Sequence, residues 1–225
     1  MDSIAIVNGD AFGLLEGLSD GFGQAAVVDY PWEFANGSRP GQREHENSED
    51  WTMQDNDRLG AVLSEVRRVL APGSWVFVFA DDDVYPAFRR ATERALEFRK
   101  TLIWDTERIG TGHYFRGRHQ YILAATAGDT DRYVTDVPTV LEAPAKGREP
   151  GETGVYPTEK PASLYRQFIA PVVKPGERIL EPFCGSAPGL EVAKSLGCTY
   201  WGCDISDDAL RRARGRKGQS TFDTL

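Results

Sequence analysis

Residues 178–187 read RILEPFCGSA, and this stretch decides the fold class. The apolar run before Pro182 is typical of a buried strand, and the small residues after it are typical of a turn into a helix. A second apolar run ends at Asp204. Small residues let a ligand approach the backbone at a helix start, and an acid at the next strand end can accept hydrogen bonds from both ribose hydroxyls. The stretch therefore indicates a nucleotide-type pocket.

The turn does not fit a dinucleotide. A dinucleotide-binding turn reads Gly-x-Gly-x-x-Gly, but residues 185–189 read GSAPG, with no second glycine where a pyrophosphate would touch the backbone. Nicotinamide and flavin cofactors are therefore disfavoured. The alternative to a ligand site is an ordinary joint between strand, turn and helix, with Asp204 capping the helix that follows.

Residues 181–186, EPFCGS, resemble the AdoMet-binding motif of the amino-methyltransferases, Asp-Pro-Phe-x-Gly-Ser-Gly. Glu181 replaces the usual Asp, and Ala187 replaces the last Gly, which implies a turn that avoids a positive φ there. The resemblance implies S-adenosyl-L-methionine (AdoMet) as the cofactor. In this part of the chain it assigns to the cofactor Glu181, Phe183, Cys184, Gly185, Ser186, Ala187, Asp204 and Ile205.

A second segment, AVVDYPW at residues 26–32, resembles the Asp-Pro-Pro-Tyr or Asp-Pro-Pro-Trp motif of the same family. An amino group on a base is a poor nucleophile because its lone pair is delocalised, and a carboxylate beside a carbonyl can orient the group and free that pair. The resemblance implies that Asp29 supplies the carboxylate, Tyr30 the carbonyl and Trp32 a stacking face. Pro31 completes the turn. Tyr30 replaces the usual proline, which reduces the rigidity of the turn, and a buried Trp after a proline is the structural alternative.

Two further segments support the same family. The strand-like run before Asp10 and Ala11 resembles the family's adenine-contacting strand end, and Lys160 followed by Pro161 resembles its Lys-Pro segment beside the amino-acid end of AdoMet. A surface loop with Pro161 at the first helical position is the alternative for the second segment. Because the base motif precedes the cofactor motif, the chain from Ile4 to about Arg214 resembles the beta-ordered DNA amino-methyltransferases (N6-adenine or N4-cytosine).

The alternation of apolar patterns predicts an α/β fold in a single domain, residues 1–225. We expect a doubly wound, mostly parallel, seven-stranded sheet with an antiparallel edge hairpin, in the circularly permuted order of a class I AdoMet-dependent methyltransferase. The strand ending at Asp29 should then lie beside the strand ending at Glu181. The expected strands are 4–7, 25–29, 75–80, 101–104, 121–125, 178–180 and 200–203, and the expected helices are 11–18, 59–70, 84–98, 190–196 and those beginning near 161 and 206.

Composition agrees with one soluble enzyme domain. The chain has 225 residues, of which 40% are hydrophobic, enough for one buried core. It has no run of about eighteen apolar residues and no basic signal-peptide start, so we expect a soluble, cytoplasmic protein with no membrane contact. Cys184, Cys198 and Cys203 lack the paired spacing of a zinc site, so we expect buried thiols and no metal.

The formal charge of -8 argues against indiscriminate binding of nucleic acid, so any DNA-binding face must be local. The best candidate is the loop at residues 108–119, where cationic and aromatic residues can grip phosphates and fill the gap left by an extruded base. A solvated hairpin tip is the alternative. The expected DNA contacts are Arg39, Arg43, Arg108, His113, Arg116 and Arg118. Residues 35–52 are expected to form a flexible loop over the pocket, and residues 127–155 form a short target-recognition segment with a short or relaxed target sequence.

Together, these resemblances imply a site-specific DNA methyltransferase that moves a methyl group from AdoMet to the exocyclic amine of a flipped base. Asp29 at the first motif position favours adenine N6, and cytosine N4 is the alternative. Two rival functions are a methyltransferase of RNA, protein or small molecules and a non-catalytic AdoMet-binding protein. Assays that offer labelled AdoMet with each kind of substrate distinguish them. The oligomeric state stays open, although related enzymes are often homodimers, and no restriction partner is identified.

Overall fold

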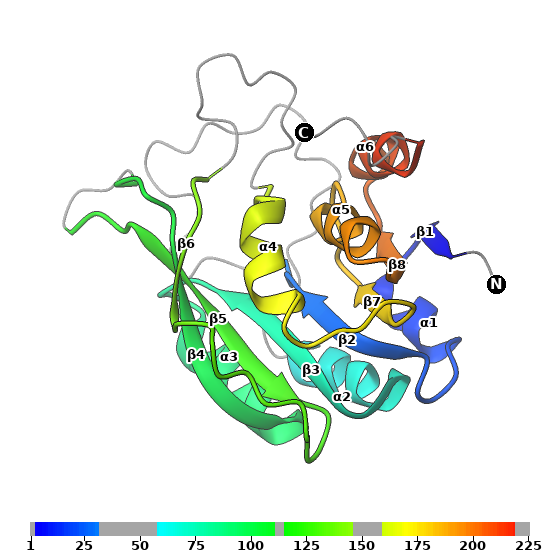
Figure 1. The fold of residues 1–225 in the computed structure, drawn as a ribbon, viewed down its shortest axis with the longest axis horizontal. Helices are drawn as coiled ribbons and strands as arrows, with labels where there is room; N and C mark the ends of the chain where they lie inside the picture. The colour runs from blue at the N-terminus through cyan, green and yellow to red at the C-terminus, as the bar shows by residue number, and fades with distance from the viewer. Residues whose placement is uncertain (1–2, 32–57, 111–114, 146–158, 219–225) are drawn as a thin grey trace.

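One central sheet organises the chain. A computed structural model describes residues 3–31, 58–110, 115–145 and 159–218. Within these residues, eight strands pair in the order β1-β8-β7-β2-β3-β5-β4-β6 (Figure 1). The strands are β1 (Ile4–Asn8), β2 (Gly23–Val28), β3 (Leu70–Ala80), β4 (Glu97–Asp105), β5 (His119–Thr126), β6 (Val140–Glu142), β7 (Arg178–Glu181) and β8 (Thr199–Asp204). The helices are α1 (Ala11–Glu16), α2 (Leu59–Val69), α3 (Tyr85–Ala95), α4 (Ala162–Ile169), α5 (Pro188–Ser195) and α6 (Asp207–Gly218).

Amphipathic spacing explains why the helices form where they do. In α2 and α4, apolar residues recur three or four positions apart, so that they lie on one side of the helix and can be buried together. The buried residues of α2 are Leu59, Val62, Leu63, Val66 and Val69. Those of α4 are Leu164, Tyr165, Phe168 and Ile169. The predicted one-sided helix after Pro161 is confirmed.

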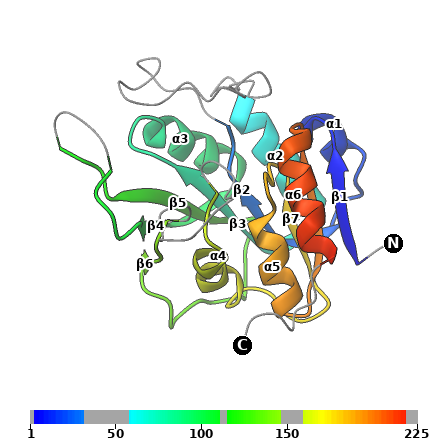
Figure 2. The ribbon, with the colours of Figure 1, turned by 90° about the horizontal axis from the view of Figure 1, so that it is seen from above.

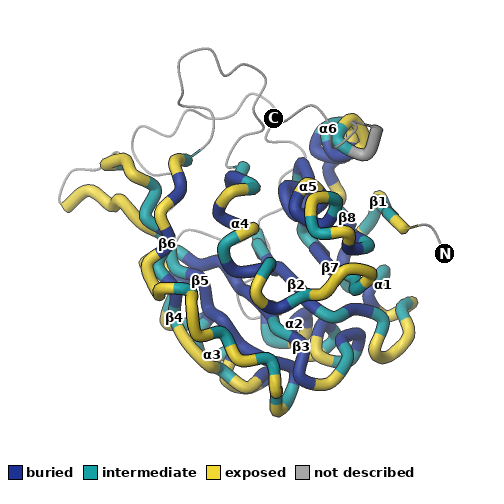
Figure 3. The backbone as a smooth tube through the Cα atoms, in the orientation of Figure 1, coloured by how far each residue is buried: buried dark blue, intermediate teal, exposed yellow. Residues whose placement is uncertain are grey.

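Helices cover both faces of the sheet (Figure 2). Residues of α1, α2 and α3 belong to one buried cluster, and residues of α4, α5 and α6 belong to another. Successive residues of β2 point alternately into the two clusters, with Ala26 and Val28 in the first and Val27 in the second, as a pleated strand requires. Burial is deepest in the central strands and on the sheet-facing sides of the helices (Figure 3). The doubly wound arrangement is confirmed.

The strand order confirms the predicted permutation. In the half of the sheet that starts at β7, β8 is the second strand and β1 is the third. The first strand in the sequence is therefore the outermost strand of this half, and the last strand in the sequence lies between it and β7. β5 pairs antiparallel with β3 and β4, and the other pairings are parallel. Since the chain winds outward from β7 in one direction and from β2 in the other, a ligand crevice is expected between their carboxyl ends.

Three predictions about the fold are wrong. Within the described residues the sheet has eight strands rather than seven, because β6 pairs in parallel with β4. The β4–β5 hairpin is antiparallel as predicted, but β6 covers its outer side, so the hairpin does not form the edge. β6 was missed because Leu141 is its one buried residue, which leaves no periodic pattern to read. The helix predicted to reach Phe98 ends at Ala95, since that part of the segment already pairs as β4.

Some predicted features lie outside the described residues. These are the loop at residues 35–52, Trp32, Arg39, Arg43, His113 and the last ten residues, 146–155, of the candidate recognition segment. In the parts of the chain that the structure describes, every helix is too short or too polar to cross a membrane.

Candidate functional site

Three acids meet at one edge of the sheet. β2 and β7 pair in parallel, with Ala26 opposite Leu180, so Asp29 and Glu181 lie at neighbouring strand ends. Asp204 ends β8, the other neighbour of β7. Burial is the main reason that the pKa of Glu181 rises to about 8 and that the pKa of Asp204 also rises, and the negative charge of Asp29 adds to both shifts. The predicted adjacency of the two motifs is confirmed.

The turn between β7 and α5 is held by backbone hydrogen bonds. The amide of Cys184 donates to the carbonyl of Cys203 over 2.9 Å, and the amide of Gly185 donates to Oδ2 of Asp204 over 2.8 Å. Gly185 has a φ of 50°. Because this glycine has no Cβ, the backbone stays accessible at the start of α5, as the sequence pattern predicts.

Ala187 contradicts the prediction that the turn avoids a positive φ. Its φ and ψ are both 59°, in the left-handed region, and it caps the start of α5. This conformation costs an L-residue about 1–2 kcal/mol. The methyl group is fully buried in the core cluster beneath α4, α5 and α6, which offsets part of that cost. The turn therefore keeps the conformation that glycine usually adopts there, although alanine occupies the position.

Glu181 is buried, and two glycines leave the space that its side chain and that of Tyr200 occupy. The hydroxyl of Tyr200 donates to Glu181 Oε2 over 2.5 Å, and the amide of Gly189 donates to the same oxygen over 3.2 Å. A Cβ at position 189 would lie 2.7 Å from this oxygen, and a Cβ at Gly202 would lie 2.6 Å from the Tyr200 hydroxyl. Sequence analysis missed Tyr200, because nothing local marks it as the partner of an acid on the next strand.

Asp204 connects the turn to the edge of the sheet. Besides Gly185, it accepts a hydrogen bond from the amide of Ser206 over 2.9 Å. The hydroxyl of Ser206 accepts from the amide of Ala209 over 3.3 Å, so Ser206, not Asp204, caps α6. The alternative in which Asp204 serves only as a helix cap is therefore wrong. Ile205, next to Asp204, leaves 44% of its surface exposed.

The end of β1 lies beside Asp204. The amide of Gly9 donates to the Asp204 carbonyl over 3.1 Å. Asp10 is exposed and caps α1 by accepting from the amide of Gly13 over 3.3 Å, whereas Ala11 is buried. Asp10 therefore stands at the same edge of the sheet as the three acids.

The base segment and the cofactor segment also touch through aromatic rings. Tyr30 is 1% exposed and packs edge-on against Phe183 at 5.2 Å between ring centroids and against Phe88 at 6.0 Å. Its side chain thus belongs to the core. Pro31 follows, and Trp32 lies outside the described residues.

Lys160 pairs with Asp29. Its ammonium group donates to Asp29 Oδ2, and the Lys160 side chain is 6% exposed. The neighbouring Glu159 accepts from the Ser186 hydroxyl over 2.6 Å and from Arg216 over 2.5 Å. The structure thus brings Lys160 to the base segment and Ser186 to Glu159. Glu159 was missed, because the sequence gives no sign that this acid is buried.

The β4–β5 hairpin extends beyond the sheet as a two-stranded arm (Figure 3). The amide of Thr106 donates to the carbonyl of Arg118 over 2.9 Å, and the amide of Gly110 donates to the carbonyl of Gly117 over 2.7 Å. Arg118 pairs with Asp105 at 2.7 Å. Because β4 runs parallel to β3 and β2, the arm leaves from the same edge of the sheet as Asp29.

Exposed side chains mark this arm. Arg116 and Arg118 are exposed, and the Nε of Arg116 donates to the Gly110 carbonyl over 2.7 Å. Phe115 is fully exposed, and Ile109 is 59% exposed. Arg108 is exposed as well. The part of the predicted DNA-binding loop that the structure describes is therefore a projecting, mixed cationic and apolar surface.

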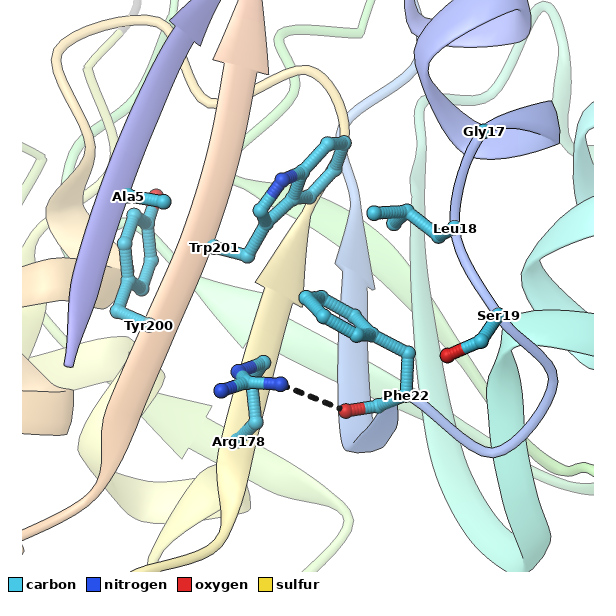
Figure 4. Close-up of a pocket in the computed structure, with 8 residues that line it drawn as sticks. All are labelled: Ala5, Gly17, Leu18, Ser19, Phe22, Arg178, Tyr200 and Trp201. Carbon is cyan, nitrogen blue, oxygen red and sulfur yellow. Dashed lines mark hydrogen bonds between the residues drawn. The ribbon is translucent and has the colours of Figure 1, made fainter. Parts of the chain in front are cut away.

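An open cavity of about 360 Å³ lies elsewhere (Figure 4). It is lined by residues at the amino ends of the parallel strands, including Arg178, Trp201 and Ala5, and by Phe22. The Arg178 guanidinium donates to the Phe22 carbonyl over 3.2 Å and lies 4.1 Å from its ring centroid. Because ligands of open α/β sheets bind at the carboxyl ends, this cavity is not the candidate site.

All three cysteines are buried and unpaired in disulfides. Burial raises the pKa of the Cys184, Cys198 and Cys203 thiols, so they remain protonated and unreactive. The expected buried thiols are confirmed. The described ranges hold no cluster of three or more His, Cys, Asp and Glu side chains placed for a metal ion.

Comparison with known proteins agrees with this site. The family model of N6/N4 DNA methylases matches residues 25–214. The type II methyltransferase M.HhaII of Haemophilus parahaemolyticus is 25% identical over 148 residues, which cover 64% of this chain and 63% of that protein. The chain thus spans slightly less than two thirds of the length of this relative.

Solved structures share the fold. The putative DNA modification methylase TTHA0409 from Thermus thermophilus, complexed with S-adenosyl-L-methionine, has a TM-score of 0.71 and 17% identity, covering 98% of this chain and 96% of that chain. The cytosine-N4-specific PvuII DNA methyltransferase has a TM-score of 0.73 and 12% identity, covering 99% and 89%. At these identities the likeness establishes a methyltransferase fold.

Gly202→Ala is expected to destabilise the protein by about 1–3 kcal/mol, because the new Cβ would displace the Tyr200 hydroxyl from Glu181 in a packed core. Urea unfolding measures the change. Gly60→Ala is the matched control, since nothing lies within 4 Å of a Cβ there, and alanine should stabilise α2 by up to about 1 kcal/mol. Equal stability of Gly202→Ala and wild type would contradict the described Glu181–Tyr200 contact.

Glu181→Gln should remove one pH dependence of stability. Because the pKa of Glu181 is raised to about 8 from 4.5, the folded protein holds a proton that the unfolded chain releases between these values. The stabilisation that this bound proton gives to the folded protein is fully present below pH 4.5 and is lost as the pH rises through 8. Wild type should therefore lose stability relative to Glu181→Gln from about pH 5 to about pH 8 in urea unfolding. A constant difference between the two proteins would contradict the assignment.

Proposed function

This chain belongs to the N6/N4 DNA methylase family. We propose that it transfers the methyl group of AdoMet to the exocyclic amine of a DNA base, and that this amine is N6 of adenine. AdoMet supplies an electrophilic methyl group on sulfur. The nitrogen of the base forms a bond to this carbon as the carbon–sulfur bond breaks and its electron pair stays on sulfur. S-adenosylhomocysteine leaves, and the methylated nitrogen releases a proton to solvent.

The observation that carries the proposal is the meeting of the two motifs. Asp29 leaves β2 and the small-residue turn leaves β7, and these strands are paired neighbours. Holding two reactants in one cleft removes much of the entropic barrier of a bimolecular transfer. If the turn after β7 were only a joint between a strand and a helix, it would not need Asp29, which comes from a segment near the other end of the chain, beside it.

The cofactor side of the site has the chemistry that AdoMet requires. Gly185 leaves space for a close approach to the backbone, and Asp204 offers carboxylate oxygens to a ribose. We assign to Asp10 the polar contact and to the exposed Ile205 the apolar contact with the adenine ring. The acidic groups also suit a cofactor that carries a sulfonium and an ammonium charge. We assign AdoMet to this turn, and we assign Phe183, Cys184, Ser186 and Ala187 as the residues of the turn that surround it.

On the base side, we assign to Asp29 the role of accepting an N–H bond of the target amine. A main-chain carbonyl at Tyr30 would accept the second. Such acceptors draw the hydrogens aside and free the nitrogen lone pair for attack. The buried ring of Tyr30 supports this assignment, because its side chain packs against Phe183 and leaves only the backbone for the base. An aspartate at this motif position favours adenine.

The described part of the arm, residues 106–110 and 115–118, is the proposed DNA contact. Arg108, Arg116 and Arg118 are exposed there on a protein whose formal charge is -8, and a local cationic surface is what phosphate binding needs. Phe115 is fully exposed, and an apolar side chain can fill the space that a rotated base leaves. The arm leaves from the edge of the sheet that carries Asp29.

Methyl transfer to DNA tests the function directly. Duplex DNA incubated with the protein and labelled AdoMet should gain label, and nucleoside mass spectrometry should identify N6-methyladenine. Asp29→Ala should reduce incorporation to background and leave calorimetric AdoMet binding near the wild-type value. The exposed Asp20, which precedes β2 at the opposite edge of the sheet, gives the matched control, Asp20→Ala, which should keep full activity.

Label in RNA or protein but not in DNA would refute the substrate. N4-methylcytosine as the sole product would refute the base assignment, and full activity of Asp29→Ala would refute the catalytic assignment.

The double variant Arg116→Ala/Arg118→Ala should weaken DNA binding and lower the slope of log K against log salt by about 2, because each phosphate contact contributes about 0.9. Fluorescence anisotropy with labelled duplex at several salt concentrations measures this slope. Arg90→Ala/Arg94→Ala removes two exposed arginines of α3 and should leave the slope unchanged. If the two double variants bind DNA alike, the arm is not the DNA contact.

A further inference from the structure

Two consecutive residues, Glu159 and Lys160, connect the two halves of the candidate site. Glu159 reaches the cofactor turn and α6 through Ser186 and Arg216, and Lys160 reaches Asp29 of the base segment. We propose that Lys160 is a positioning residue for Asp29: it holds one carboxylate oxygen so that the other faces the target amine. This inference rests on the proposed function and adds a residue role to it.

The contact itself is specific. Lys160 donates to Oδ2 of Asp29 and forms an ion pair with that acid. An aspartate has two oxygens on a freely turning carboxylate. An ammonium held on one oxygen restricts the rotation of the group and so limits where Oδ1 can lie. A base amine needs such a fixed acceptor, because a misplacement of about 1 Å can cost a large part of the rate.

Charge explains why a cation is needed at this point. Asp29 acts electrostatically on both Glu181 and Asp204, so three acids share one edge of the sheet. Like charges at close range repel each other. Lys160 is 6% exposed and its ammonium lies 5.2 Å from the ring centroid of Phe79. A cation held this close offsets the negative charge that the acids bring to this edge of the sheet.

The frame around Lys160 is rigid on both sides. Glu159 has a side chain that is 4% exposed, and it accepts from Ser186 and from Arg216, which in turn binds Glu191 of α5 at 2.9 Å. Pro161 follows Lys160 with a φ of -71° and is the N-cap residue of α4. Since a proline has little freedom in φ, the Lys160 backbone is fixed between an anchored acid and a packed helix. Its ammonium is therefore placed by the fold.

This role differs from that of the Lys-Pro segment in the family resemblance. A contact to the amino-acid end of AdoMet would make Lys160 a determinant of cofactor affinity. A positioning role for Asp29 makes it a determinant of turnover. The two roles therefore predict a different split between the AdoMet Kd and kcat.

Lys160→Met keeps the length of the side chain and removes its charge. We expect kcat for DNA methylation to fall about 100-fold, the order expected for a misplaced reacting group, while the calorimetric Kd for AdoMet stays near the wild-type value. Lys160→Arg should recover most of kcat, because it restores a cation. Lys100→Met changes an exposed lysine of β4 and should leave both quantities unchanged. If Lys160→Met does not fold, Lys160→Gln takes its place.

An unchanged kcat in the charge-removing variant would overturn the proposal. A rise in the AdoMet Kd as large as the fall in kcat would also overturn it, because Lys160 would then be a cofactor contact. A wild-type protein that methylates no DNA would instead refute the proposed function.

A measurement without turnover keeps the inference testable in every case. Urea unfolding of Asp29→Asn, Lys160→Met and the double variant forms a double-mutant cycle. We expect the two changes to be non-additive, since each removes the same ion pair. Additive effects would overturn the positioning role, whatever the activity.

Discussion

The parallel pairing of β2 with β7 is the constraint on which the rest of the site depends. The two strands are remote in sequence, yet Ala25 lies opposite Ile179 and Ala26 opposite Leu180. Asp29 and the cofactor turn leave from the carboxyl ends of these strands, so a hydrogen-bonded ladder, and not a loop, sets their separation. Packing of Tyr30 against Phe183 at 5.2 Å supports the same joint on the side of the sheet that α1, α2 and α3 cover. The proximity that methyl transfer needs is thus built into the rigid part of the molecule.

The three acids at this edge are stabilised in three different ways. Burial raises the pKa of Glu181 to about 8, so this carboxyl group can stay protonated, with Tyr200 and Gly189 as its hydrogen-bond donors. Asp204 accepts from backbone amides, which stabilise a carboxylate without a counter-ion. Asp29 is the acid that pairs with a lysine side chain. Its side chain is 22% exposed, whereas Glu181 is 1% exposed, so Asp29 is the more accessible of these two acids.

Space at the site is controlled by small residues at particular positions. Gly189 and Gly202 leave room for Glu181 and Tyr200, where a Cβ would approach within 2.7 Å and 2.6 Å. Ala187 shows the limit of reading such positions by residue type. A missing glycine suggested a different turn, but the hydrogen bond from its amide to the carbonyl of Cys184, 2.7 Å long, and the burial of its methyl group hold alanine in the left-handed region. Tertiary packing outweighed the local preference.

The sequence by itself determined seven of the eight described strands, the presence of the helices, the two motifs and the pairing of the two motif strands, because periodic burial and short contiguous patterns carry that information. Through the expected strand order it placed the strand ending at Asp29 beside the strand ending at Glu181. Only the tertiary structure decided that Lys160 pairs with Asp29, that Glu159 is buried between Ser186 and Arg216, and that β6 extends the sheet beyond β4. Each of these features joins atoms from segments far apart in the chain. Residue type and spacing within one segment hold no record of such contacts, which arise only when the packed layers bring the segments together.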